Sequence, residues 1–219
     1  MKKIFVVLFF ITSSIYSVYG QSINEIFLEL SSHGGISKEE RQLMIDNYIQ
    51  NKRGREYGIG ESKHHLTTYE PNSGYLSYSG AYEGSSSITF WNLTNGAKLI
   101  ATKSSSCGGA CDCDISFIYK GSLYMTRLSI NNVLPTITFA DFMDVEQMKK
   151  DGIDIEREMN LFYGKDLMYS LPLSGKNIVV SSQYHELDMS DNLKKYDLGW
   201  KLELIWNDGT FLKKKKTGL

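Results

Sequence analysis

Three short glycine-containing turns constrain the fold of this chain more than any other feature. They are Asn95-Gly96, Gly121-Ser122 and Asp208-Gly209. Dipeptides of this kind adopt the backbone angles that tight hairpin loops require. Stretches rich in β-branched and aromatic residues flank each of them. The pattern therefore predicts four consecutive antiparallel strands, at 87–92, 97–103, 114–120 and 123–129, and a separate hairpin near the C-terminal end.

The loop lengths also predict which residues face each other across the strands. If Gly121 and Ser122 alone form their loop, the facing pairs are Ile115 with Leu128, Phe117 with Thr126 and Tyr119 with Tyr124. A two-residue loop at Asp208-Gly209 pairs Trp206 with Phe211 and Ile205 with Leu212. These are productive cross-strand pairs, so both hairpins have a defined register.

Two serine-to-glutamate spacings, at Ser22–Glu25 and Ser37–Glu40, have the form of helix capping boxes. Two short helices joined by Gly34-Gly35 therefore form a predicted helical hairpin. The apolar stripe of the second helix comprises Leu43, Met44 and Tyr48, with Ile45 and Ile49 as further candidates. A weaker signal at Thr138–Asp141 predicts one further helix that ends near Gly152.

The segments between these elements are less regular. Residues 54–86 are rich in Gly, Ser and Tyr, and they form either a long loop or a set of short edge strands, with one possible strand at 75–79. Residues 167–171 and 177–182 are possible strands around a turn. The chain is therefore predicted to be an α+β protein, with an N-terminal helical hairpin, an antiparallel β-meander, one further helix and a C-terminal β-hairpin.

The N-terminus predicts export. Lys2 and Lys3 precede an apolar run over 4–11, and small or modest residues lead to Gly20. This order is typical of a bacterial signal peptide, 1–20, that is cleaved after Gly20. An uncleaved anchor is the alternative, but the stretch is shorter than the about 20 apolar residues that a span needs. Residues 21–219 then form a single periplasmic or secreted domain without a membrane span, since no Pro-rich or charge-block linker divides them.

Composition excludes several classes of protein. Charged residues are 22% and hydrophobic residues 42% of the chain, which excludes a disordered protein. Lys and Arg number 24 against 25 Asp and Glu. Because there is no basic excess, we expect no nucleic-acid partner.

Three cysteines, Cys107, Cys111 and Cys113, lie at the expected tip of a hairpin. Export favours their oxidation. A Cys107–Cys113 bridge would join two strand ends, a Cys107–Cys111 bridge would close a small Gly-rich loop, and a Cys111–Cys113 bridge would be strained. A redox thiol or a metal site are the functional alternatives. Because C-x-x-C is absent and no fourth ligand has a familiar spacing, we expect a structural disulfide, no metal and no cofactor.

The tyrosines of the Gly/Ser-rich region, above all Tyr75, Tyr78 and Tyr82, are the candidate binding residues. Tyrosine gives a large contact area at low entropic cost, and it stacks on sugars. Packing of these rings over the sheet is the alternative.

No sequence motif marks a catalytic site. A G-x-S-x-G elbow is absent, and His185 beside Glu186 is the only hint of a hydrolase. His64 and His65 lack the spacing of a zinc helix. Lys213–Lys216 is predicted to protect an edge strand from pairing. The preferred hypothesis is a non-enzymatic exported domain that binds a protein or a glycan. The alternatives are a hydrolase with an unmarked site and a thiol-redox protein that uses the three cysteines.

Overall fold

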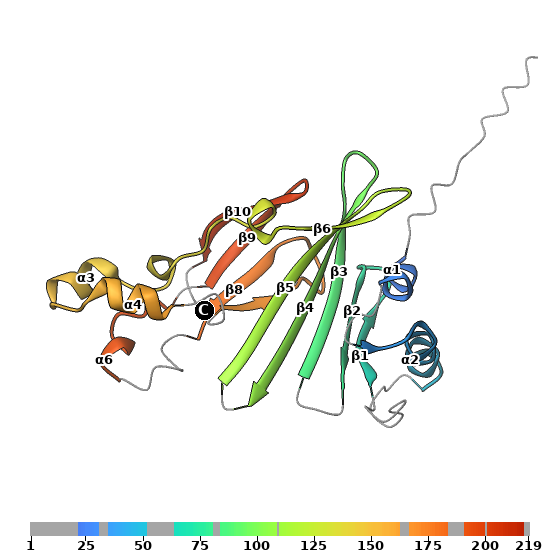
Figure 1. The fold of residues 1–219 in the computed structure, drawn as a ribbon, viewed down its shortest axis with the longest axis horizontal. Coiled ribbons are helices and arrows are strands. Elements are labelled where there is room, and N and C mark those ends of the chain that lie inside the picture. Colours follow the sequence, from blue (N-terminus) through green and yellow to red (C-terminus); the bar gives the residue numbers. More distant parts are fainter. Residues whose placement is uncertain are drawn as a thin grey trace, which may run out of the picture.

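The structure, a computed structural model, describes residues 22–30, 35–51, 64–80, 84–108, 110–162, 167–183, 191–199 and 201–216. The predicted leader 1–20 and its cleavage site lie outside the described residues. Two antiparallel sheets and a few short helices make an α+β fold, in the order expected from the sequence. Figure 1 shows the N-terminal helix pair at one end of the molecule and the later helices at the other.

The larger sheet is a meander in which every strand pairs with its neighbour in the sequence. The strands are β1 His65–Glu70, β2 Tyr75–Ser79, β3 Gly84–Asn92, β4 Lys98–Gly108, β5 Ala110–Lys120 and β6 Met125–Leu128. The four expected strands correspond to β3–β6, and the possible strand at 75–79 is confirmed as β2. The sequence left open whether residues 54–86 form a long loop or short edge strands. The described part contains two short strands, of which β1 lies at the sheet edge and β2 pairs with both β1 and β3.

The β3–β4 and β5–β6 loops of the meander differ in how well the sequence predicted them. Asn95-Gly96 does form a hairpin loop, in which the Leu93 N–H donates to the Ala97 carbonyl and Gly96 has a φ of 81°. The register around Gly121-Ser122 was wrong: Phe117 faces Leu128, and Tyr119 faces Thr126. The reason is loop length, because the Gly121 N–H bonds to the Tyr124 carbonyl and the turn extends over 121–124.

The second sheet has the strand order β10-β9-β8-β7. Its strands are β7 Leu167–Ser170, β8 Ile178–Ser182, β9 Lys201–Asn207 and β10 Thr210–Lys216. The C-terminal hairpin has the predicted register, with Trp206 opposite Phe211 and Ile205 opposite Leu212. Asp208 and Gly209 have φ values of 37° and 98°, the positive angles that a two-residue hairpin turn of type I′ requires.

The helices are short. They are α1 Ile23–Glu29, α2 Lys38–Asn51, α3 Val145–Lys150, α4 Ile155–Leu161 and α6 Asp191–Lys194, with single 3₁₀ turns η2 Ile130–Asn132 and η3 Phe139–Asp141. Both predicted capping boxes are present. The helix expected from Thr138 to Gly152 is divided, because the Thr138–Asp141 box opens only η3 and the Asp144 side chain caps α3.

One face of the meander is covered by α1 and α2. The buried contacts join Ile23, Ile26 and Phe27 of α1 to apolar side chains of four strands: Leu66, Leu76, Ile88 and Ile100. In α2, Met44 and Ile45 are buried as expected. Leu43 and Ile49 are 48% and 56% exposed instead, and the buried face includes Arg41, which is 3% exposed.

The opposite face of the meander packs on the second sheet. Trp91, Leu99, Ala101 and Phe117 join one continuous core with Ile178, Val180, Leu202, Leu204 and Phe211. Strand β4 therefore contributes to two separate cores, since Leu99 and Ala101 enter one and Ile100 enters the other. This alternation is what a strand buried on both faces shows.

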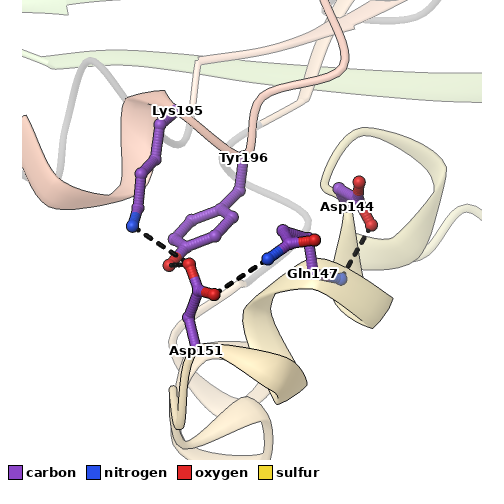
Figure 2. A network of polar contacts seen from close by, with 5 residues as sticks. All are labelled: Asp144, Gln147, Asp151, Lys195 and Tyr196. Carbon is purple, nitrogen blue, oxygen red and sulfur yellow. Dashed lines mark hydrogen bonds and ion pairs between the residues drawn. The ribbon is translucent and has the colours of Figure 1, made fainter.

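A polar network joins α3 to the end of α6 (Figure 2). One carboxylate oxygen of Asp151 accepts hydrogen bonds from the Tyr196 hydroxyl at 2.6 Å and the Lys195 ammonium at 3.1 Å. The other accepts from the Gln147 side chain at 2.8 Å. These three donors stabilise the charged carboxylate and lower the pKa of Asp151 to about 2. The hydrogen bond from Tyr196 has the largest effect.

The network predicts a pH dependence of stability. The pKa of Asp151 in the unfolded chain is about 3.9, so its contribution is complete above that value and is lost as the pH falls through about 2. We expect Asp151→Asn to lower the urea midpoint at pH 6, and the difference from the wild type to shrink between pH 4 and pH 2. Glu156→Gln, an exposed position on α4, is the control. If the urea midpoints of Asp151→Asn and the wild type differed by the same amount from pH 4 to pH 2, the Asp151 carboxylate would not be the source of the pH dependence.

Candidate functional site

The tyrosines chosen from the sequence do not share one surface. Tyr75 and Tyr78 alternate on β2 and so point to opposite faces of the meander. Tyr78 is 3% exposed and lies in the helix-covered core, with its ring 5.6 Å from that of Phe27. Burial raises its pKa. Tyr78 therefore fits the packing alternative, whereas Tyr75 is half-buried at the border of the other core. Tyr82 lies outside the described residues.

The cysteines form one bridge and leave one free thiol. Cys107 and Cys111 face each other at the end of β4 and β5, and their sulfurs are bonded at 2.05 Å. The sequence left several cysteine pairings open. The structure has the Cys107–Cys111 bridge, which closes a small Gly-rich loop. Cys113 is a free thiol, 4% exposed in the core between the sheets. Burial raises its pKa, although a backbone hydrogen bond from Tyr169 acts in the opposite sense. A protonated, shielded thiol is a poor nucleophile, which disfavours the redox alternative.

A row of hydroxyl groups extends along the meander where the core ends. Tyr75, Thr89, Ala101 and Phe117 face one another on β2–β5, at the border of the second sheet. The next facing positions on the same side are the half-buried Ser77, the buried Ser87 and the half-buried Lys103, and those beyond them are Ser79, Ser85 and Ser105. Thr67 of β1 joins them, because its hydroxyl contacts that of Ser77. We call this set the hydroxyl face: Thr67, Ser77, Ser79, Ser85, Ser87, Lys103 and Ser105.

The hydroxyls bond to each other and keep capacity for a ligand. The oxygens of Thr67 and Ser77 lie 2.7 Å apart, and those of Ser85 and Ser105 lie 2.8 Å apart. Both pairs lie at the surface. A hydroxyl supplies one donor and two acceptor sites, so each pair uses one proton internally and leaves a second one free. The face can therefore both donate and accept hydrogen bonds.

The hydroxyl face has a defined extent and charge. Neighbouring strands lie about 4.8 Å apart, so the four strands β1–β4 give it a width of about 14 Å. Tyr75 lies at one end, and the Cys107–Cys111 bridge lies beyond Ser105 at the other. Lys103 is its half-buried cation, and within the described ranges it forms no ion pair. His65 faces Ser79 at the β1 edge.

The remaining sequence candidates lie elsewhere. The His64 ring stacks edge-on against Tyr78, with ring centres 6.3 Å apart. No group of metal-ligating side chains gathers in the part of the chain that the structure describes. His185 and Glu186 lie outside it. Lys213 belongs to β10, an edge strand as expected, and its ammonium lies 2.7 Å from the Asp141 carboxylate.

Sequence reasoning missed the hydroxyl face. A signal for it is present in the two triplets Ser85–Ser87 and Ser104–Ser106, which lie on paired strands. Because alternate residues of a strand share one face, the middle residue of each triplet points to the opposite side from the two residues beside it. Only the pairing of β3 with β4 shows that Ser85, Ser87 and Ser105 share a side.

Comparisons with known proteins identify the fold. No protein-family model matches the chain, and neither does any curated protein. Among solved structures, it is similar to a domain of an uncharacterized protein from Porphyromonas gingivalis W83, with a TM-score of 0.61 and 15% identity. The match covers 88% of this chain and 97% of that one. At this identity the likeness shows a shared fold. None of the described helices is long and apolar enough to cross a membrane.

Proposed function

We propose that this protein is an exported, non-enzymatic domain that binds a partner through the hydroxyl face. The observation that carries the proposal is the set of exposed hydroxyl pairs on β1–β4, placed beside the half-buried Tyr75. Rigid strands hold these groups, which limits the conformational entropy lost on binding. The sequence pointed to Tyr75 as a candidate binding residue. The hydroxyl face begins beside Tyr75 and continues onto the neighbouring strands β3 and β4.

Two features support export. The leader has the length and order of charges and apolar residues that signal peptides have. The bridge between Cys107 and Cys111 is of a kind that persists mainly in oxidising compartments. A periplasmic or secreted location follows from these features as part of the proposal.

The hydrolase alternative has one geometric support, the position of His65 opposite Ser79. A serine nucleophile needs a base in hydrogen-bond reach and a third group that orients the base. The sequence around Ser79 does not have the G-x-S-x-G form of a nucleophile elbow. Binding without catalysis is therefore the simpler use of the face.

The experiment is a glycan array and a screen of extracellular proteins with the purified protein and two matched variants. Ser85→Gln places an uncharged bulky side chain on the hydroxyl face. Ser104→Gln places the same side chain on the other face of the neighbouring strand, and both positions are exposed. We expect Ser85→Gln to weaken binding of any ligand found by at least about tenfold, about 1.4 kcal/mol, and Ser104→Gln to leave it unchanged.

The urea midpoint of each variant checks that both remain folded. Equal affinities of the wild type and Ser85→Gln for every ligand would remove the hydroxyl face as the binding surface. Turnover of a bound glycan that is lost in Ser79→Ala would favour the hydrolase alternative instead.

A further inference from the structure

We infer that the ligand of the hydroxyl face is a glycan that carries carboxylate groups, and that one carboxylate pairs with Lys103. This inference rests on the proposed function and adds the chemical class of the ligand. Three properties of the face support this inference. It has few apolar side chains that could anchor a partner, it has many hydroxyl groups, and it carries the positive charge of Lys103.

The composition of the face disfavours a protein partner. Protein interfaces take most of their binding energy from buried aromatic, Met and Arg side chains. Ser and Thr are under-represented among the hot-spot residues of such interfaces. The hydroxyl face consists of six Ser and Thr residues and one lysine, with Tyr75 at its end. Such a surface offers a protein little apolar area to bury.

Hydrogen-bonding capacity favours a polyhydroxylated ligand. Each sugar hydroxyl is both donor and acceptor, as are the serine and threonine hydroxyls that face it. The Thr67–Ser77 and Ser85–Ser105 pairs lie on neighbouring pairs of strands. An extended glycan that crosses the strands can therefore contact both pairs, and Tyr75 at the border can stack on a sugar ring.

The position of Lys103 indicates a negative charge on the ligand. Its side chain is half-buried between Ser87 on β3 and Ile115 on β5. Around it, Cys113 is protonated because its pKa is raised by burial, Asp114 points to the other face of β5, and Glu70 lies three strands away on β1. A ligand carboxylate at this position forms a charge-assisted hydrogen bond, which is stronger than a neutral one.

The test compares acidic polysaccharides with their own carboxyl-reduced forms. Oligogalacturonate, alginate oligomers and sialylated oligosaccharides are titrated calorimetrically beside the same chains in which the carboxylate has become a primary alcohol. We expect the wild type to bind at least one acidic form about tenfold or more tightly than its reduced form. Lys103→Met should reduce this ratio to within about twofold, because the acidic form loses its charge-assisted hydrogen bond. Lys38→Met on α2 is the matched control and should keep the full ratio.

Each result separates the inference from the proposed function. Equal affinity for acidic and reduced chains, or a ratio that Lys103→Met leaves intact, overturns the carboxylate inference and keeps glycan binding. Binding of a protein alone, weakened by Ser85→Gln, overturns the glycan class and keeps the proposed function. Binding of nothing on either screen overturns both.

Discussion

Replacement of Trp91 by alanine is expected to lower the free energy of unfolding by about 3–5 kcal/mol. Trp91 is 3% exposed and lies where the two sheets meet. Its ring stacks on Trp206 of β9 at 5.4 Å and meets Phe211 of β10 edge-on at 5.3 Å. Its indole N–H donates to the Lys176 carbonyl at 2.9 Å. The substitution removes these contacts together and leaves a cavity that rigid strands cannot fill.

Urea denaturation followed by far-ultraviolet circular dichroism measures this effect, since the substitution removes a fluorophore. Tyr124→Ala is the control, because Tyr124 is an aromatic residue that is 60% exposed in the turn between β5 and β6. We expect the control to change stability by no more than about 0.5 kcal/mol. A loss below about 1 kcal/mol for Trp91→Ala would show that the sheets are held together mainly elsewhere.

The second large effect is expected at Arg41, where alanine should cost about 2–4 kcal/mol. Arg41 is 3% exposed on α2, and its guanidinium donates to the carbonyls of Leu30 and Leu28 at the end of α1. It also lies 5.7 Å from the centre of the Phe27 ring. Burial lowers the pKa of Arg41. Its removal leaves helix-end carbonyls without their donors, a cost that adds to the lost packing.

Two further variants make the Arg41 prediction specific. Arg41→Lys keeps the charge but loses the planar fork that reaches both carbonyls, so an intermediate loss is expected. Lys38→Ala, at an exposed position on the same helix, should change stability by about 0.5 kcal/mol or less. If Arg41→Ala behaved like Lys38→Ala, the guanidinium would have no part in holding the two helices together.

The sequence predicted best where the chemistry of a turn is local. Asp208-Gly209 specifies its loop and therefore the register of β9 with β10, because few other residues tolerate two successive positive φ angles. Gly121-Ser122 was less informative. Gly121 needs no special angle there, and nothing in the dipeptide prevents Leu123 and Tyr124 from joining the loop. In the observed register, the buried Phe117 faces Leu128, and both side chains belong to the core between the sheets.

Long-range contacts explain the other differences. Hydrophobic periodicity alone assigned Leu43 and Ile49 of α2 to the core. It could not show that Arg41 meets the carbonyl groups of α1, since that contact depends on how the two helices pack. The site is a similar case. Tyr75 was found from composition, but the serines beside it come from strands whose pairing no local signal defines.

The position of Cys113 has a consequence for oxidative folding. Cys107 faces Cys111 in the native pairing of β4 with β5. A slip of two residues preserves which side chains point to which face, unlike a slip of one, and it would bring Cys107 opposite Cys113. The nascent hairpin thus has a misaligned alternative with its own competing crosslink. In the native alignment Cys113 lies instead in the core between the sheets, 4% exposed, where the packed second sheet shields its thiol from exchange with the bridge.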